Sequence, residues 1–152
     1  MTMHMAYGSN MDLERLEKRI GRRPSRLLGH KRHYALRFNK QAEGKPGIGW
    51  ANIVRGKADD EVYGIVYDLD ESELKKLDKC ERVEEGHYRR KTIIIELDGK
   101  KCKAIVYVAC RKWVKRGLLP TPCYVKHLLG GRDLLPPTFV ADLEKQPTRE
   151  PQ

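Results

Sequence analysis

The chain has 152 residues, which suits a single domain with a buried core and one enclosed pocket. Its 31 Lys and Arg residues against 21 Asp and Glu residues give a net charge of +10, which attracts nucleic acid, anionic membranes and anionic substrates alike. No run approaches the roughly 18 apolar residues of a membrane-spanning helix, and the N-terminal residues lack the pattern of a signal peptide. We therefore expect a soluble, cytoplasmic protein with no membrane partner.

The cysteines are too scattered to indicate a metal site. Cys80, Cys102, Cys110 and Cys123 form no CxxC pair and have no closely spaced histidine partner. Because thiols stay reduced inside cells, we expect four reduced cysteines and no metal.

The first expected elements are a short strand over Met5–Tyr7, a turn over Gly8–Asn10 and a helix that ends at Gly21. Ser9 followed by Asp12 resembles a capping box, which places the turn at the N-terminus of the helix. Backbone N–H groups and the helix dipole at such a position favour a negative charge. The same residues are also ordinary in turns and caps, so a purely structural role is the alternative.

The next segments read as strands and a loop. Arg32–Phe38 alternates as a half-buried strand does, with His33 on the polar face, and Gln41–Gly49 is a loop rich in glycine and charge. Trp50–Val54 resumes as a strand. Glu61–Asp68 is apolar on both faces, which predicts a central strand.

A second capping signature, Asp70 with Glu73, predicts a short helix that ends just before Glu81. Lys91–Leu97 and Cys102–Val108 are rich in strand-forming residues and are separated by an Asp-Gly pair, which indicates a β-hairpin. The sheet is therefore at least partly antiparallel.

The C-terminal part predicts short helices over Tyr124–Leu129 and Pro136–Leu143. We expect one domain over residues 1–143 and a polar tail over 144–152 that frays. The mixed order of hairpins and helices indicates an α+β class, with a single sheet or barrel and peripheral helices.

Several motifs occur together in a recognisable order. They are AYGSNM, GWANIV, DEVYGIVYDLDESELKKLDKCE, GHYRRKTI, CKAIVYVA and PTPCYVKHLLGG. With them the chain resembles, from about Met5 to Gly131, the γ-glutamylcyclotransferase family in its wider sense, the AIG2-like proteins. The resemblance implies a mixed, mainly antiparallel β-barrel-like sheet with peripheral helices and a pocket at one mouth.

The resemblance also implies roles for particular residues. Glu81 corresponds to the catalytic acid/base. Seven residues correspond to substrate-binding positions: Tyr7, Gly8, Ser9 and Asn10 in the opening loop, then Tyr88, Tyr107 and Tyr124. For the last three tyrosines the alternative is core packing with each hydroxyl bonded to a neighbour, and we interpret His87 and His127 as structural or surface residues.

The implied reaction is an intramolecular cyclisation. The α-amine of a small γ-glutamyl substrate attacks its own γ-carbonyl, which forms 5-oxoproline and expels the amine partner without a cofactor or metal. Orientation alone can supply about 7 to 11 kcal/mol in such a ring closure, and a carboxylate that moves the proton adds about 10²- to 10⁴-fold. We expect apolar surroundings to raise the pKa of Glu81 towards neutrality.

One position departs from the family pattern. Glycine often follows the catalytic glutamate, whereas this chain has Arg82. A cation there could lower the pKa of Glu81 or bind an additional substrate carboxylate, so the amine-side group stays open. Cyclisation of γ-glutamylamines and removal of a γ-glutamyl protecting group in biosynthesis are the alternative reactions, and a homodimer is compatible with the sequence.

Two other classes of function compete with an enzyme. Basic clusters at residues 22–23, 30–32, 89–91 and 111–112 suggest a nucleic-acid-binding module. Single-strand binders interleave exposed aromatics with such cations, whereas most tyrosines here lie within apolar runs, so we expect only non-specific attraction. An inactive partner-binding domain of this fold would have no need to keep both YGSN and Glu81.

Overall fold

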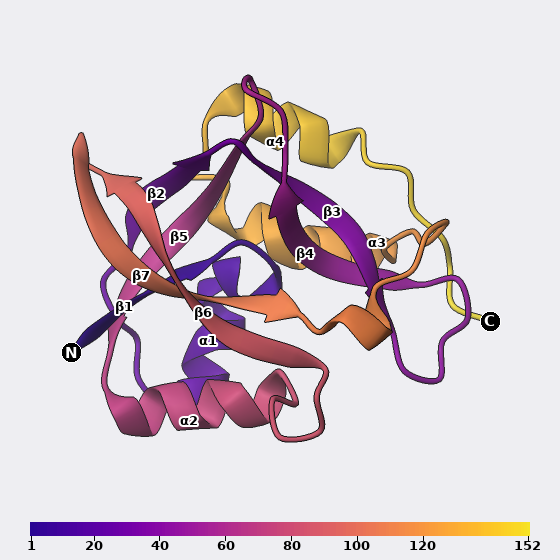
Figure 1. Cartoon of the computed structure of the whole chain (residues 1–152), viewed down its shortest axis with the longest axis horizontal. Helices are drawn as coiled ribbons and strands as arrows, with labels where there is room; N and C mark the ends of the chain where they lie inside the picture. The colour runs from indigo at the N-terminus through magenta and orange to yellow at the C-terminus, as the bar shows by residue number, and fades with distance from the viewer.

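The computed structural model describes residues 1–152 and consists of a β-barrel, a separate β-ribbon and helices around them (Figure 1). The strands are β1 (Thr2–Ala6), β2 (Leu27–Arg32), β3 (Tyr34–Gln41), β4 (Gly49–Arg55), β5 (Glu61–Leu69), β6 (Tyr88–Leu97) and β7 (Lys100–Ala109). The helices are α1 (Leu13–Ile20), α2 (Glu71–Cys80), α3 (Pro122–Leu128) and α4 (Pro137–Glu144).

Five strands close into a barrel in the order β1-β5-β2-β6-β7, while β3 and β4 form the ribbon. All pairings in the barrel are antiparallel except the closing contact, where His4 of β1 pairs with Ile105 of β7 in parallel. The predicted α+β class with a mixed, mainly antiparallel barrel is confirmed.

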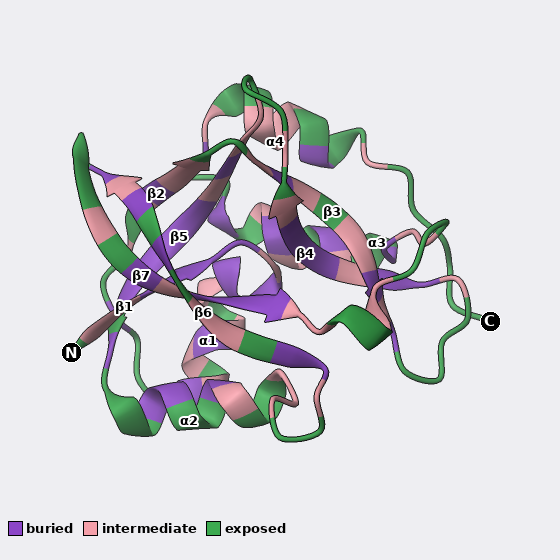
Figure 2. Cartoon of the chain, in the orientation of Figure 1, coloured by how far each residue is buried: buried purple, intermediate pink, exposed green.

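Strand β5 lies between β1 and β2 and is buried on both faces (Figure 2). Val62 and Val66 point into the barrel core, while Ile65, Tyr67 and Leu69 pack with the hydrophobic residues of α1 and α2. This two-sided burial explains its continuous apolar sequence, and the predicted central position is confirmed.

The predicted hairpin is β6–β7. Asp98 and Gly99 at its turn have φ angles of 51° and 74°, the left-handed values that a tight two-residue turn needs to match the twist of the strands.

The strand predicted from Arg32 is wrong at its start. His33 adopts a φ of 68° and separates β2 from β3. The N–H of His33 donates to the carbonyl of Asp60 and its own carbonyl accepts from Gly56, both at 2.8 Å. These long-range bonds stabilise a break that the alternating pattern does not reveal. Strand β2 itself was not predicted, because Leu27–Arg32 lacks a period-two pattern.

The N-cap of α1 is Asp12 and not Ser9. The Asp12 carboxylate accepts from the N–H groups of Glu14 at 3.1 Å and Arg15 at 3.4 Å, and Ser9–Met11 form a separate 3-10 turn. The Ser9 hydroxyl is instead used by the Arg15 side chain, which lies 3.1 Å away.

The capping box of α2 is confirmed. Asp70 accepts from the Glu73 N–H at 2.8 Å, and the Glu73 carboxylate accepts from the Asp70 N–H at 3.0 Å. Helix α2 ends at Cys80, so Glu81 is its C-cap and lies where the sequence places it.

Arg149 joins the C-terminal tail to the domain. The N–H of Arg149 donates to the carbonyl of Pro120 at 2.9 Å, and its guanidinium donates to the carbonyl of Gly47 at 2.8 Å. The tail therefore runs past α3 along the edge of the ribbon (Figure 1). None of the helices is both long enough and apolar enough to cross a membrane.

Candidate active site

A cavity of about 640 Å³ opens between the end of the barrel, the ribbon and α3. All eight residues that the sequence singled out contribute to its lining: Tyr7, Gly8, Ser9, Asn10, Glu81, Tyr88, Tyr107 and Tyr124. Residues separated by more than a hundred positions thus meet in one place. A volume of this size accommodates a small-molecule substrate.

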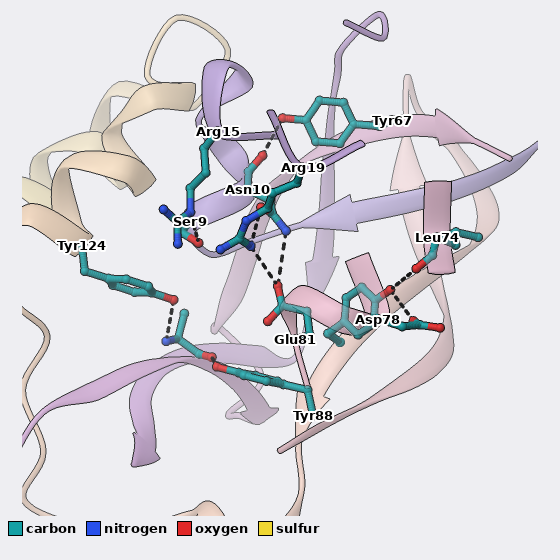
Figure 3. Close-up of polar contacts among 12 residues, drawn as sticks. Ser9, Asn10, Arg15, Arg19, Tyr67, Leu74, Asp78, Glu81, Tyr88 and Tyr124 are labelled. Atoms are coloured by element: carbon teal, nitrogen blue, oxygen red, sulfur yellow. Dashed lines mark hydrogen bonds and ion pairs between the residues drawn. The ribbon is translucent and has the colours of Figure 1, made fainter. Parts of the chain in front are cut away.

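Glu81 projects into this cavity with only 19% of its side chain exposed. Its Oε1 accepts a hydrogen bond from Asn10 Nδ2 at 3.3 Å and lies 3.6 Å from Arg19 Nη1 (Figure 3). Burial raises the pKa of Glu81 above its ordinary value, while the positive charges of Arg19, Arg15 and Lys40 and the bond from Asn10 oppose the rise. The net direction is upward, as predicted from the apolar surroundings of this carboxylate.

Two arginines that the sequence analysis missed complete this wall. Arg15 and Arg19 lie one turn apart on α1, and both face the opening loop (Figure 3). Arg15 Nε donates to Ser9 Oγ at 3.1 Å and Arg19 Nη1 donates to Asn10 Oδ1 at 3.0 Å. Their spacing of four residues directly after YGSN is the signal that could have identified them.

The side chains of Ser9 and Asn10 thus bind the two arginines, and the backbone N–H groups of this loop remain free to bind a ligand. The N–H groups of Gly8, Ser9 and Asn10 donate no hydrogen bond within the protein, although Ser9 and Asn10 are buried. Unpaired buried N–H groups are rare and suit an acceptor supplied by a ligand. A Cβ at Gly8 would lie 3.1 Å from Tyr124 Oη, which explains the absence of a side chain there.

Tyr88 and Tyr124, both labelled in Figure 3, bond to the backbone of Ala51. The Tyr88 hydroxyl donates to the Ala51 carbonyl at 2.8 Å, whereas the Tyr124 hydroxyl accepts from the Ala51 N–H at 2.9 Å. The proton of the Tyr124 hydroxyl is therefore left for another acceptor. Burial raises the pKa of both tyrosines, so both stay neutral.

The hydroxyls of the other two tyrosines have structural partners. Tyr7 donates to the carbonyl of Tyr107. Tyr107 donates to Asp78 Oδ1 at 2.7 Å and approaches the Leu74 carbonyl at 3.3 Å, while Arg90 pairs with both oxygens of Asp78. The rings of Tyr7 and Tyr107 line the cavity, but their polar ends support its wall.

Arg82 also lines the cavity, but two other carboxylates engage its side chain. Its guanidinium pairs with Glu43 and with Glu85, the latter at 3.0 Å. The cations with the largest effect on the pKa of Glu81 are Arg19, Arg15 and Lys40, and Arg82 is not among them. The φ of Arg82 is 54°, a left-handed conformation that glycine adopts without strain.

His87 and Lys40 form a buried pair on the opposite wall. Lys40 Nζ lies 2.7 Å from His87 Nδ1, and the two residues retain only 4% and 3% exposure. His87 also stacks on Trp113. The sequence therefore did not reveal that His87 contacts Lys40, a cation that lines the cavity. His127 pairs with Asp12 at 2.8 Å and joins α3 to the start of α1.

Comparison with known proteins identifies the fold and the family. The model of the AIG2-like family matches residues 61–143. The chain is 28% identical over 141 residues to the human protein named gamma-glutamylcyclotransferase, and the match covers 85% of this chain and 69% of that protein.

Solved structures share the fold. One named gamma-glutamyl cyclotransferase superimposes with a TM-score of 0.84 at 24% identity and covers 98% of this chain and 89% of its own. YkqA from Bacillus subtilis gives a TM-score of 0.81 at 22% identity, covering 97% of this chain and 56% of its own. A yeast gamma-glutamyl cyclotransferase described as specific to glutathione gives 0.66 at 13% identity, covering 95% and 94%. Since the family model matches more than half of the sequence, the chain belongs to the AIG2-like family.

Proposed function

We propose that the chain is a γ-glutamylcyclotransferase that converts a γ-glutamyl amino acid or peptide to 5-oxoproline and a free amine. One observation carries the proposal: a half-buried carboxylate with a raised pKa shares a cavity with unpaired loop N–H groups and two arginines. Similarity to the human enzyme of that name agrees with it.

The cavity provides for both charged ends of a γ-glutamyl group. Arg15, beside Ser9, offers a positive charge for the substrate α-carboxylate, and the N–H groups of residues 8–10 would donate hydrogen bonds to that carboxylate or to the oxyanion. The α-ammonium then faces the carboxylate of Glu81.

Glu81 serves as base and then as acid in this mechanism. It takes a proton from the α-ammonium, and the freed amine attacks the γ-carbonyl carbon to form the ring C–N bond. Collapse of the tetrahedral intermediate breaks the bond to the amine partner, which receives the proton from Glu81. The ring nitrogen then gives its second proton to Glu81, and this proton passes to the released amine, which leaves as an ammonium. No water is consumed, and the raised pKa of Glu81 matches these proton transfers.

Tyr124 has the remaining polar group of this wall. Because its hydroxyl accepts from Ala51, its proton is directed to a further acceptor. We assign it to an oxygen of the substrate, whereas Tyr7, Tyr88 and Tyr107 position the cavity wall.

The test is release of 5-oxoproline from a panel of γ-glutamyl amino acids, γ-glutamylamines and glutathione. Glu81→Gln should lower kcat by about 10²- to 10⁴-fold. Glu84→Gln is a matched control, because Glu84 lies three residues further on and is exposed. Absence of product from every substrate, or equal activity of the two variants, would contradict the proposal.

A further inference from the structure

Lys40 is a buried cation that forms no ion pair. Its side chain is 4% exposed and lines the cavity, yet no ion pair of the chain includes it. The nearby carboxylate of Glu43 pairs instead with Arg82 and lies 3.6 Å from His87 Nε2. Buried charges in proteins are normally paired, so an ammonium in a cavity wall that contacts no carboxylate directly suits an anionic ligand.

A β-bulge places this ammonium in the cavity. The pairing of β3 with β4 shifts by one residue between Arg37 and Lys40. Lys40 therefore lies opposite Trp50 and not opposite the residue of β4 that precedes Trp50. The extra residue turns Lys40 to the face of the ribbon that carries Trp50, which also lines the cavity. A regular strand would place Lys40 on the other face.

The charge of Glu81 acts on Lys40, but the two residues form no ion pair, and the groups in direct contact with Lys40 are neutral. His87 Nδ1 lies 2.7 Å from Nζ, and burial together with the charge of Lys40 lowers the pKa of His87, so the ring stays neutral and accepts a hydrogen bond. The rings of Trp113 and Tyr88 lie 4.8 Å and 5.5 Å from Nζ. Burial lowers the pKa of Lys40 to about 8, so the amine is still mostly charged at pH 7.

Lys40 and the arginines of α1 lie on different elements of the cavity. Arg15 and Arg19 are attached to Ser9 and Asn10, where the γ-glutamyl end is proposed to bind. Lys40 lies on the ribbon beside His87. A second carboxylate, on the part of the substrate that leaves, would therefore meet Lys40.

We propose that Lys40 binds a carboxylate on the departing amine half of the substrate and so selects γ-glutamyl amino acids over γ-glutamylamines. This inference rests on the proposed cyclotransferase function. Lys40 is then a specificity-determining residue. Arg82 already pairs with Glu43, whereas Lys40 has no ion-pair partner and is available to bind the carboxylate of the departing half.

The test compares γ-glutamyl-alanine with γ-glutamyl-alaninamide, which differ only in the charge of the departing half. We expect kcat/KM of the wild type to favour the carboxylate by about 10- to 100-fold, the value of a charge-assisted hydrogen bond. Lys40→Met should reduce this ratio to below about 3-fold. Lys103→Met removes an exposed lysine of β7 as a matched control and should preserve the ratio.

A ratio near one in the wild type, or an equal loss on both substrates in Lys40→Met, overturns the assignment. If Lys40→Met does not fold, Lys40→Gln and the comparison of the two substrates on the wild type still decide. Calorimetric binding of the same pair to Glu81→Gln separates the two proposals. If Glu81→Gln binds the carboxylate substrate more tightly but the wild type turns over neither substrate, cyclisation is refuted and the Lys40 site is supported. If the wild type turns over both substrates equally and Glu81→Gln binds them equally, cyclisation is supported and the Lys40 site is refuted.

Discussion

Tyr107→Phe should damage stability more than activity, because the Tyr107 hydroxyl bonds to Asp78 and not to the cavity. Deleting it removes a 2.7 Å hydrogen bond to a carboxylate, a class of bond worth about 1.5 to 3 kcal/mol. Arg90 still pairs with both oxygens of Asp78, so we expect the lower end, about 1.5 to 2 kcal/mol. For a chain of this length that loss lowers Tm by roughly 3 to 8 °C.

The assay combines denaturant unfolding with kcat/KM for 5-oxoproline release. Burial alone would raise the pKa of Asp78, but the bonds from Arg90 and Tyr107 outweigh it and lower the pKa below 3.8. A carboxylate with a lowered pKa stabilises the fold at pH values above its ordinary pKa, and this stabilisation is lost as acid protonates it. The difference in unfolding free energy between wild type and Tyr107→Phe should therefore be full at pH 6 and should narrow below pH 3.8. Tyr124→Phe should instead lower kcat/KM by at least about 10-fold. A Tyr107→Phe variant with intact stability and a similar loss of activity would refute this division of roles.

Three further changes follow from the geometry. Arg82→Gly should be more stable than Arg82→Ala by about 1 kcal/mol in urea unfolding, because both lose the same ion pairs but only alanine is strained at a φ of 54°; equal stabilities would show that the backbone conformation is unimportant. Gly8→Ala should lower kcat/KM, because the new Cβ would lie 3.1 Å from Tyr124 Oη and displace it; unchanged kinetics would mean that the hydroxyl has no catalytic part. The kcat/KM profile should rise with pH around a midpoint above 4.5, since burial raises the pKa of Glu81. Because the pKa of Glu81 is raised in the folded state, the wild type should lose stability as pH rises above 4.5, and Glu81→Gln should gain stability relative to it over that rise.

Local signals in the sequence predicted most of the fold. The Asp70–Glu73 capping box and the Asp-Gly hairpin turn depend on neighbouring residues alone, so both are found where expected. Strand β5 was recognisable because burial on both faces leaves a continuous apolar run.

The features that were missed depend on distant partners. The left-handed His33 is held by Asp60 and Gly56, and the bulge before Lys40 is visible only in the register of β3 against β4. The resemblance identified the residues that line the cavity. It could not say which tyrosine hydroxyls face a structural partner, because that depends on contacts such as Tyr107 with Asp78.

The central claim is that the γ-glutamyl group is cyclised by its own amine and not hydrolysed by water. The most direct test is mass spectrometry of the products formed by the wild type in ¹⁸O-labelled water. We expect 5-oxoproline without ¹⁸O, together with one equivalent of the amine partner, and neither product from Glu81→Gln at a comparable rate. Glutamate carrying ¹⁸O would show attack by water and contradict the account.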